Sequence, residues 1–349
     1  MTLALILVVV GALLLPFMAR WSFLVNGGAW LTGDSSVYAL GPATDEWAHR
    51  TVFLIGFLVA AAFLARDRWL AAIVGYAGLQ TFVLGPRVVS VYLLLGCLAI
   101  AVMRHAPYLI RTTTVTLLGW SAIVQAGLIV VQRLRGLEGV GTFGVSGLAA
   151  AYLVGAGMLV PGWLLPVIGL AVACTGSRAG LAAWCVGVAV RYGREWPAAT
   201  LAALVFLTII VGLTLAQSTS TSVRYQIQRD AMVSWLRTPL AVLGGFGLGA
   251  WHQHAMAQPI PFSAGDRYYG EPKRFLSAHN DALQWVYETG LIGTAFLALW
   301  FRRWRRAIMR PPFAPAYAAL AVMALTWFPF HDLRLGMPAA VLIGLGTAD

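Results

Sequence analysis

The stretch 112-TTTVTLLGWSAIVQAGLIVV-131 contains twenty residues and no charged side chain. A helix of about 20 predominantly apolar residues is long enough to cross the hydrocarbon core of a bilayer. The whole chain has the same character, since 60% of its 349 residues are hydrophobic and only 11% are charged. Soluble domains carry about a quarter charged residues. We therefore expect an all-α integral membrane protein.

Twelve apolar runs are candidate membrane-spanning helices: 3–19, 51–65, 69–84, 88–103, 112–131, 147–160, 163–175, 179–190, 197–216, 283–301, 314–328 and 335–347. An even number of spans puts both chain ends on one side. Arginines at 66 and 68, 104 and 111, 191 and 194, and five between 302 and 310 then share that side. The positive-inside rule makes it the cytoplasm. The pattern predicts one polytopic membrane domain over residues 1–349.

Charge and cysteine content exclude other classes of protein. The net charge is +11, but much of the basic charge stands in short loops between apolar runs, which indicates topology rather than nucleic-acid binding. Cysteines 97, 174 and 185 all lie inside apolar runs, so we expect small buried side chains and neither a disulfide framework nor a cysteine metal site. Residues 3–19 are interpreted as a first spanning helix rather than a removable signal peptide.

A long connection, residues 217–282, is predicted between the ninth and tenth spans, on the periplasmic side. Its 66 residues far exceed an ordinary connection, and such loops are usually functional or disordered. Ser218–Ser222 could cap a helix. Apolar residues then recur every four positions, which predicts an amphipathic helix with a stripe of Val223, Ile227, Ala231 and Trp235. Pro239 and the glycines of Gly244–Gly249 are expected to end it.

The next apolar run begins with the residues best suited to chemistry. The segment 278-AHNDALQWVYETGLIG-293 contains His279, Asn280 and Glu288. Ionisable groups at membrane depth are costly and usually face a cavity or pathway. Histidine is also the side chain best suited to proton transfer near neutral pH. His279 is therefore a candidate general base; the alternative is an interfacial histidine that caps the helix.

Two arginines are candidates for phosphate binding. Arg178 follows Gly176 and Ser177 between two apolar runs, and Arg224 opens the amphipathic helix of the long loop. The planar guanidinium can bind phosphate through two hydrogen bonds and stays charged. Alternatives are that Arg178 extends to lipid headgroups and that Arg224 lies on a solvated helix face. Together with His279, the two arginines suggest a site that holds phosphate while a proton is removed nearby.

Metal and nucleotide sites are not predicted. His252 and His254 have alternating spacing, but no third ligand follows at a recognisable distance, and the chain has no Asp-x-Asp. Gly244–Gly249 lacks the strand context and the Lys-Ser/Thr ending of a nucleotide loop, so a flexible turn is expected. Ser177 lies outside a Gly-x-Ser-x-Gly pattern, and no acyl-transfer triad can be assembled.

Four features occur in an order that resembles a known family. They are Thr175-Gly-Ser-Arg178 at the start of an apolar run; Arg224 on a helix that leads to Pro239 and Gly244-Gly-Phe-Gly-Leu-Gly249; the string His279-Asn-x-x-Leu-Gln-x-x-x-Glu288-x-Gly-Leu-Ile-Gly293; and His331-Asp332 with Pro338 in the last hairpin. This looks like the O-antigen ligase and polymerase superfamily of bacterial membrane glycosyltransferases. The motifs cover about residues 175–345.

The resemblance implies an activity and a location. Glycan carried on undecaprenyl pyrophosphate would be transferred to an acceptor hydroxyl at the periplasmic face of the inner membrane, without cofactor or metal. By motif, His279 would be the base and Arg178 and Arg224 would bind pyrophosphate. Asn280 and Glu288 would orient the histidine or bind the acceptor. The expected product is inverted at the anomeric carbon.

Several functions share this donor chemistry. We favour an O-antigen ligase whose acceptor is lipid A-core, but an O-antigen or exopolysaccharide polymerase, or a protein oligosaccharyltransferase, fits the same residues. A lipid-linked oligosaccharide flippase is the alternative from another class. Transporters tend to show paired, interrupted helices in two halves, whereas the reactive residues here gather in the second half of the chain.

Overall fold

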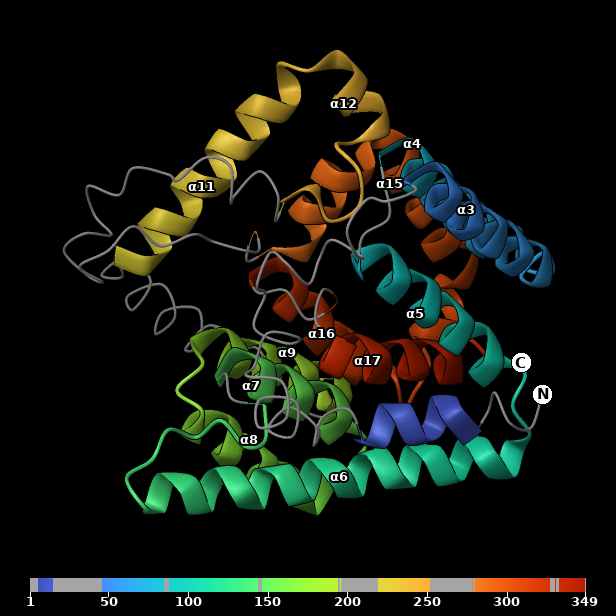
Figure 1. Ribbon diagram of the computed structural model, residues 1–349. Helices are drawn as coiled ribbons and strands as arrows, with labels where there is room; N and C mark the ends of the chain where they lie inside the picture. Colours follow the sequence, from blue (N-terminus) through green and yellow to red (C-terminus); the bar gives the residue numbers. More distant parts are fainter. Residues whose placement is uncertain are drawn as a thin grey trace. The chain divides into compact units, whose positions relative to one another are not determined.

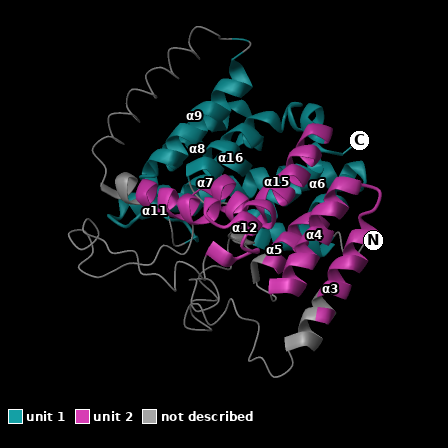
Figure 2. Cartoon of the chain, turned by 90° about the horizontal axis from the view of Figure 1, so that it is seen from above, with its two compact units in different colours: residues 1–27, 99–215, 304–349 teal, residues 28–98, 216–303 magenta. Residues whose placement is uncertain are grey.

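The computed structural model describes residues 6–14, 46–84, 88–143, 146–193, 195, 219–251, 278, 280–326, 330 and 333–348. Every regular element in these residues is a helix (Figure 1). The chain divides into two compact units, shown in different colours in Figure 2. Unit 1 comprises 1–27, 99–215 and 304–349, and unit 2 comprises 28–98 and 216–303.

Unit 1 is built on the long helix α6 (Tyr108–Leu134). After α6 the chain folds back on it, because the Gln132 side chain accepts a hydrogen bond from Gly141 N at 2.8 Å and Gln125 Nε2 donates to Thr142 Oγ1 at 2.6 Å. This unit also contains helical residues 6–14 and the helices α7 (Ser146–Ala156), α8 (Leu165–Cys174), α9 (Arg178–Tyr192), α16 (Ala314–Thr326) and α17 (Leu333–Gly346), with short 3-10 turns at Gly157–Leu159 and Gly162–Leu164.

Unit 2 contains the helix pair α3 (Glu46–Phe63) and α4 (Arg68–Leu84), followed by α11 (Thr219–Leu236) and α12 (Pro239–Gly244). Two further helices, α5 (Val88–Arg104) and α15 (Asp281–Ile308), contribute residues to both units. Asp67 begins α4: its Oδ1 accepts a hydrogen bond from Leu70 N at 3.2 Å, and its Oδ2 accepts one from Trp300 Nε1 of α15 at 3.2 Å. This carboxylate therefore joins α4 to α15 inside unit 2.

The expectation of twelve membrane-spanning helices is wrong. Among the described residues, α6 is the one helix that is long and apolar enough to cross a membrane. The other apolar helices there are shorter, at 10–17 residues: Leu54–Phe63, Arg68–Leu84, Ser90–Arg104, Ser146–Leu159, Gly162–Cys174, Ala314–Thr326 and Leu335–Gly346. The expected span 197–216 lies outside the described residues. Since the twelve spans are not confirmed, their even number no longer shows on which side of the membrane the arginine clusters lie.

The physical reason is clearest in α7. All ten residues from Gly147 to Ala156 are buried, so its apolar character matches protein neighbours on every side. The helix then gives way to a 3-10 turn at Gly157, and Pro161 follows in extended backbone. Hydropathy along the sequence records apolar side chains, but a buried helix and a helix in lipid are equally apolar.

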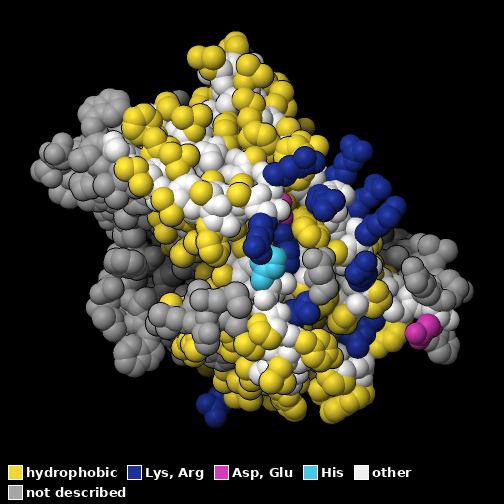
Figure 3. Space-filling view, turned by 90° about the vertical axis from the view of Figure 1, so that its right-hand side faces the viewer, with side chains coloured by type: hydrophobic (Ala, Val, Ile, Leu, Met, Phe, Trp, Pro, Cys, Tyr) yellow, Lys and Arg dark blue, Asp and Glu magenta, His cyan; other side chains and the backbone are white. Residues whose placement is uncertain are grey.

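Large hydrophobic side chains also lie on the surface. Figure 3 shows them over much of the described surface on one face, together with a group of Lys and Arg side chains. On α6 the exposed set includes Leu109, Leu117, Trp120, Val124 and Leu128, and on α3 it includes Ile55, Leu58, Val59 and Phe63. Contiguous exposed apolar surface marks an interaction with protein or membrane.

Candidate active site at the start of helix α15

Helix α15 begins with a side-chain cap. Asn280 Oδ1 accepts a hydrogen bond from Leu283 N at 3.0 Å, and the main-chain oxygen of Asn280 accepts one from Gln284 N at 3.0 Å. An Asn at this position satisfies main-chain N–H groups that have no partner inside the helix. Asn280 therefore fixes where the helix starts. Its role in acceptor binding stays a prediction.

The helix breaks at Gly290, whose φ is 64° and ψ −167°. The break leaves the carbonyl groups of the preceding turn without partners in the helix, and other segments of unit 2 supply them. Phe246 N donates to Tyr287 O at 3.0 Å and Gly247 N to Glu288 O at 2.9 Å. The glycine-rich turn thus donates main-chain hydrogen bonds to the last carbonyl groups before the break in α15.

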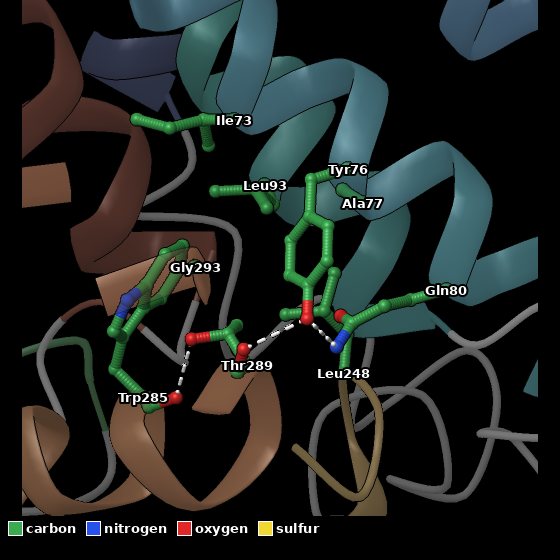
Figure 4. A pocket seen from close by; sticks show the side chains of 9 residues that line it. All are labelled: Ile73, Tyr76, Ala77, Gln80, Leu93, Leu248, Trp285, Thr289 and Gly293. Carbon is green, nitrogen blue, oxygen red and sulfur yellow. Dashed lines mark hydrogen bonds between the residues drawn. The ribbon is translucent and has the colours of Figure 1, made fainter. Parts of the chain in front are cut away.

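Helix α4 completes this pairing. Tyr76 Oη donates to Thr289 O at 3.0 Å, and Gln80 Nε2 donates to Glu288 O at 3.1 Å and to Gly244 O at 2.6 Å. Figure 4 shows Tyr76 and Gln80 extending from α4 toward Thr289, around a small cavity. Three segments of unit 2 are consequently held together by directional hydrogen bonds at one break in a helix.

Glu288 lies at the centre of this arrangement and is fully buried, with 0% of its surface exposed. Its Oε2 accepts a hydrogen bond from Gly249 N at 2.8 Å. Its Oε1 accepts one from Gln284 Nε2 at 3.0 Å and a longer one from Trp251 N at 3.4 Å. A buried carboxylate is tolerated only with such partners. This favours an orienting role for Glu288 over direct contact with the acceptor.

The predicted amphipathic helix is confirmed as α11. Ile227 and Trp235 of the predicted stripe are buried and Ala231 is partly buried in a core with Trp251 and Tyr287. Val223 has no described side chain. The Trp235 ring also donates from Nε1 to Ala241 O at 2.7 Å, which fixes α11 to α12. The apolar stripe therefore serves to dock α11 on the first part of α15.

Tyr287 connects this core to the polar centre. Its ring packs against Phe246 at 4.8 Å and against Trp251 at 5.3 Å between centroids. Burial, and to a smaller extent the neighbouring Glu288 carboxylate, raise the pKa of Tyr287 to about 12. The phenol stays protonated at neutral pH and acts here as a packing residue.

The main chain on either side of position 279 is tied to two helices. Ala278 N donates to Gln284 Oε1 at 3.0 Å, and Ala278 O accepts from Gln228 Nε2 of α11 at 2.8 Å. His279 itself lies outside the described residues, as do His252, His254 and His331. Arg224 stands four residues before Gln228 on α11, and residues four apart share a helix face. The described contact of Gln228 thus brings the helix face that carries Arg224 to Ala278, the residue before position 279.

Arg178 belongs to unit 1. It is the first residue of α9 and is exposed. Ser177 Oγ caps the helix by accepting from Gly180 N at 3.1 Å, and Thr175 Oγ1 accepts from Ser177 N at 3.1 Å. Gly176 permits this turn with a φ of 71°. The Thr-Gly-Ser-Arg motif therefore forms a rigid helix start, in the unit that does not contain Arg224, Asn280 and Glu288.

Sequence reasoning missed two residues of the site and misjudged a third feature. Gln80 and Gln284 are both buried. Gln80 bridges the main-chain oxygens of Gly244 and Glu288, and Gln284 bridges Ala278 N and the Glu288 carboxylate. Gln80 was not singled out, and Gln284 stood in the quoted string without a role. The four-residue spacing of Gln284 and Glu288 was the available signal. The expected flexible turn at Gly244–Gly249 is instead tied by hydrogen bonds to Tyr287 and Glu288. Within the described residues, no three His, Cys, Asp or Glu side chains group as a metal site.

No family model matches this chain, and no curated protein or solved structure matches it either. The fold and the site define an all-helical protein in which a buried glutamate and two glutamines organise the start of one helix. The resemblance to the O-antigen ligase and polymerase superfamily stays a prediction that rests on the residues of its motifs.

Proposed function

We propose that this protein is a bacterial glycosyltransferase that transfers glycan from undecaprenyl pyrophosphate to an acceptor hydroxyl, with lipid A-core as the favoured acceptor. One observation carries the proposal: Ala278, next to His279, is hydrogen-bonded both to Gln228 on the helix of Arg224 and to Gln284. A base and a phosphate-binding arginine need such a common frame, because reacting groups must be held in a defined geometry.

The proposed chemistry needs three side chains. His279 takes the proton of the acceptor hydroxyl while its oxygen attacks the anomeric carbon. The new carbon–oxygen bond forms as the bond to the pyrophosphate oxygen breaks on the opposite face, so the configuration inverts. Arg224 binds the pyrophosphate and stabilises the negative charge that builds on it as it leaves. The same role for Arg178 stays a prediction from the resemblance. The glycosylated acceptor, undecaprenyl pyrophosphate and the protonated histidine are the products of the step.

The proposed location is the inner membrane, with the site open to the periplasm as the resemblance implies. Two observations support the membrane location. Helix α6 is long and apolar enough to cross a bilayer, and α3 and α6 each expose a row of large hydrophobic side chains. A donor with a polyprenyl tail is itself confined to the membrane, so an enzyme that uses it must reach the bilayer.

A purified transfer assay tests the function. The protein in detergent receives a synthetic undecaprenyl-pyrophosphate-linked glycan and lipid A-core, and the product is identified by mass. We expect transfer in the presence of chelator. His279→Ala should lower turnover at least about 100-fold, the low end for a positioned base. His105, an exposed histidine of unit 1, provides the control His105→Ala, which should keep wild-type turnover.

The same assay tests the arginines and the pH dependence. Arg178→Ala and Arg224→Ala should each impair transfer, and lysine should rescue only partly because it cannot form the planar two-bond contact. Arg229→Ala is the matched control, since Arg229 is exposed on α11 and pairs with Asp230 at 2.9 Å. Turnover should rise with pH as the histidine becomes neutral, because the neutral imidazole is the form that can accept a proton.

Two results would overturn the proposal: normal turnover by His279→Ala, or by both arginine variants. Product that grows by whole repeat units without lipid A-core would identify a polymerase instead of a ligase.

A further inference from the structure

The glycine-rich turn forms a binding site for a carboxylate that the protein itself supplies. Gly245, Gly247 and Gly249 all have positive φ, at 74°, 95° and 77°. Side chains other than glycine rarely adopt this region, and successive main-chain N–H groups in such a turn can point into one concavity that binds an anion. Here the N–H groups of Gly249 and Trp251 both donate to the Glu288 carboxylate.

The glycines are also required by close approach. An added Cβ at Gly245 would collide with Glu288 O, and one at Gly290 would collide with Gly245 N and Leu243 O. Four partners from two different segments therefore meet without room for a methyl group. Glu288 is held by hydrogen bonds at its main-chain oxygen and at both carboxylate oxygens.

Gln284 links the Glu288 carboxylate to Ala278, the residue before position 279. The Gln284 side chain is 3% exposed, and its two ends serve different partners. Its amide nitrogen donates to Glu288 Oε1, so its amide oxygen must point the other way, where it accepts from Ala278 N. The carboxylate thus sets the orientation of the amide, because only the nitrogen end can donate to it.

We propose that Glu288 is a positioning residue: its carboxylate, held by the glycine-rich turn, orients Gln284, and Gln284 in turn fixes the main chain at Ala278, directly before the proposed base His279. The inference rests on the proposed function of His279 as base. Glu288 touches neither substrate nor the transferred proton. Its contribution reaches the reaction through two hydrogen bonds of 3.0 Å.

Glu288→Gln and Gln284→Leu test the role in the transfer assay. Glu288→Gln keeps the volume but presents an amide NH₂ to a site lined by N–H donors, and Gln284→Leu removes the bridge. Each should lower kcat about 10-fold to 100-fold, because small displacements of a reacting group are costly, while the KM for the lipid-linked donor stays within about two-fold. The double variant should be no slower than Gln284→Leu alone, since both substitutions interrupt the same path.

Thr289→Val is the matched control. Thr289 is buried beside Glu288, but its hydroxyl donates within α15, to Trp285 O at 2.8 Å. Its kcat should stay within about two-fold of wild type. A loss of kcat equal to that of Glu288→Gln would show that any disturbance of the buried helix has this effect, and would overturn the positioning role.

The His279→Ala background separates positioning from folding. Glu288→Gln should not lower the residual turnover of His279→Ala further, since there is no longer a base to position. A further 10-fold loss there, an unchanged kcat in the single variants, or a rise in donor KM with normal kcat would each overturn the proposal. If His279→Ala retains full turnover, the proposed function fails. If His279→Ala loses turnover but Glu288→Gln keeps the wild-type kcat, the positioning role alone fails.

Discussion

Helix α7 in unit 1 and the first part of α15 in unit 2 are both buried, yet they are buried in opposite ways. All ten residues of α7 from Gly147 to Ala156 are buried, and their side chains are mostly small and apolar. In the first part of α15 four polar residues, Asp281, Gln284, Glu288 and Thr289, are buried at 5% exposure or less, beside the buried ring of Tyr287.

The difference teaches where geometry is specified. Apolar burial is non-directional, so the neighbours of α7 can adjust to one another as long as volume is conserved. Hydrogen bonds to Glu288 are directional, and an unsatisfied buried donor costs the full loss of its hydration. Unit 2 therefore holds the main chain beside residue 279 more strictly than packing alone would, as a site for chemistry requires.

The largest expected effect would break the polar side of this comparison. Glu288→Leu fills similar space but leaves the N–H groups of Gly249 and Trp251 and the Gln284 amide without an acceptor. The free energy of unfolding should fall by about 3–5 kcal/mol, because three buried N–H donors each lose their acceptor, at about 1–3 kcal/mol for each unsatisfied group. Denaturant titration in mild detergent measures it.

Glu138→Leu in unit 1 is the control for that loss, because Glu138 is an exposed carboxylate. It should change stability by no more than about 0.5 kcal/mol. Equal losses from Glu288→Leu and Glu138→Leu would mean that the glycine-rich turn does not depend on its carboxylate.

A substitution of intermediate effect tests apolar burial in unit 1. Ile129 on α6 is fully buried, next to the returning loop at Gly139 and Gly141. Ile129→Ala should cost about 2–4 kcal/mol in the same titration, because it leaves a cavity. Its neighbour Leu128 is 40% exposed, and Leu128→Ala should cost less than about 1 kcal/mol. If Leu128→Ala cost more stability than Ile129→Ala, the assignment of the packed face of α6 would be contradicted.

The smallest effects come from two glycines with opposite roles. Gly245→Ala should destabilise by about 1–3 kcal/mol, because the positive φ is strained for alanine and the new methyl meets Glu288 O. Gly127 lies inside α6 with open space around its Cβ position, so Gly127→Ala should stabilise by about 0.5–1 kcal/mol. Thermal unfolding midpoints compare the two, and shifts of the same sign would contradict the assignment.

Much of the helix pattern was predictable from local sequence. The runs expected at 69–84, 88–103 and 112–131 correspond to α4, α5 and α6, and the stripe of the long loop corresponds to α11. These elements follow from the spacing and length of apolar residues, which is a local property of the chain. The role of the string that begins at His279 stays a prediction from its residue types.

Tertiary structure alone decided what those residues contact. The same apolar composition that predicted a span at 147–160 belongs to α7, which is buried by other helices, because hydropathy does not distinguish protein neighbours from lipid. Glu288 receives N–H groups 37 and 39 residues earlier in the chain, at Trp251 and Gly249. No local pattern specifies such a partner, since it is the folding of the glycine-rich turn onto the break at Gly290 that brings donor and acceptor within hydrogen-bond distance.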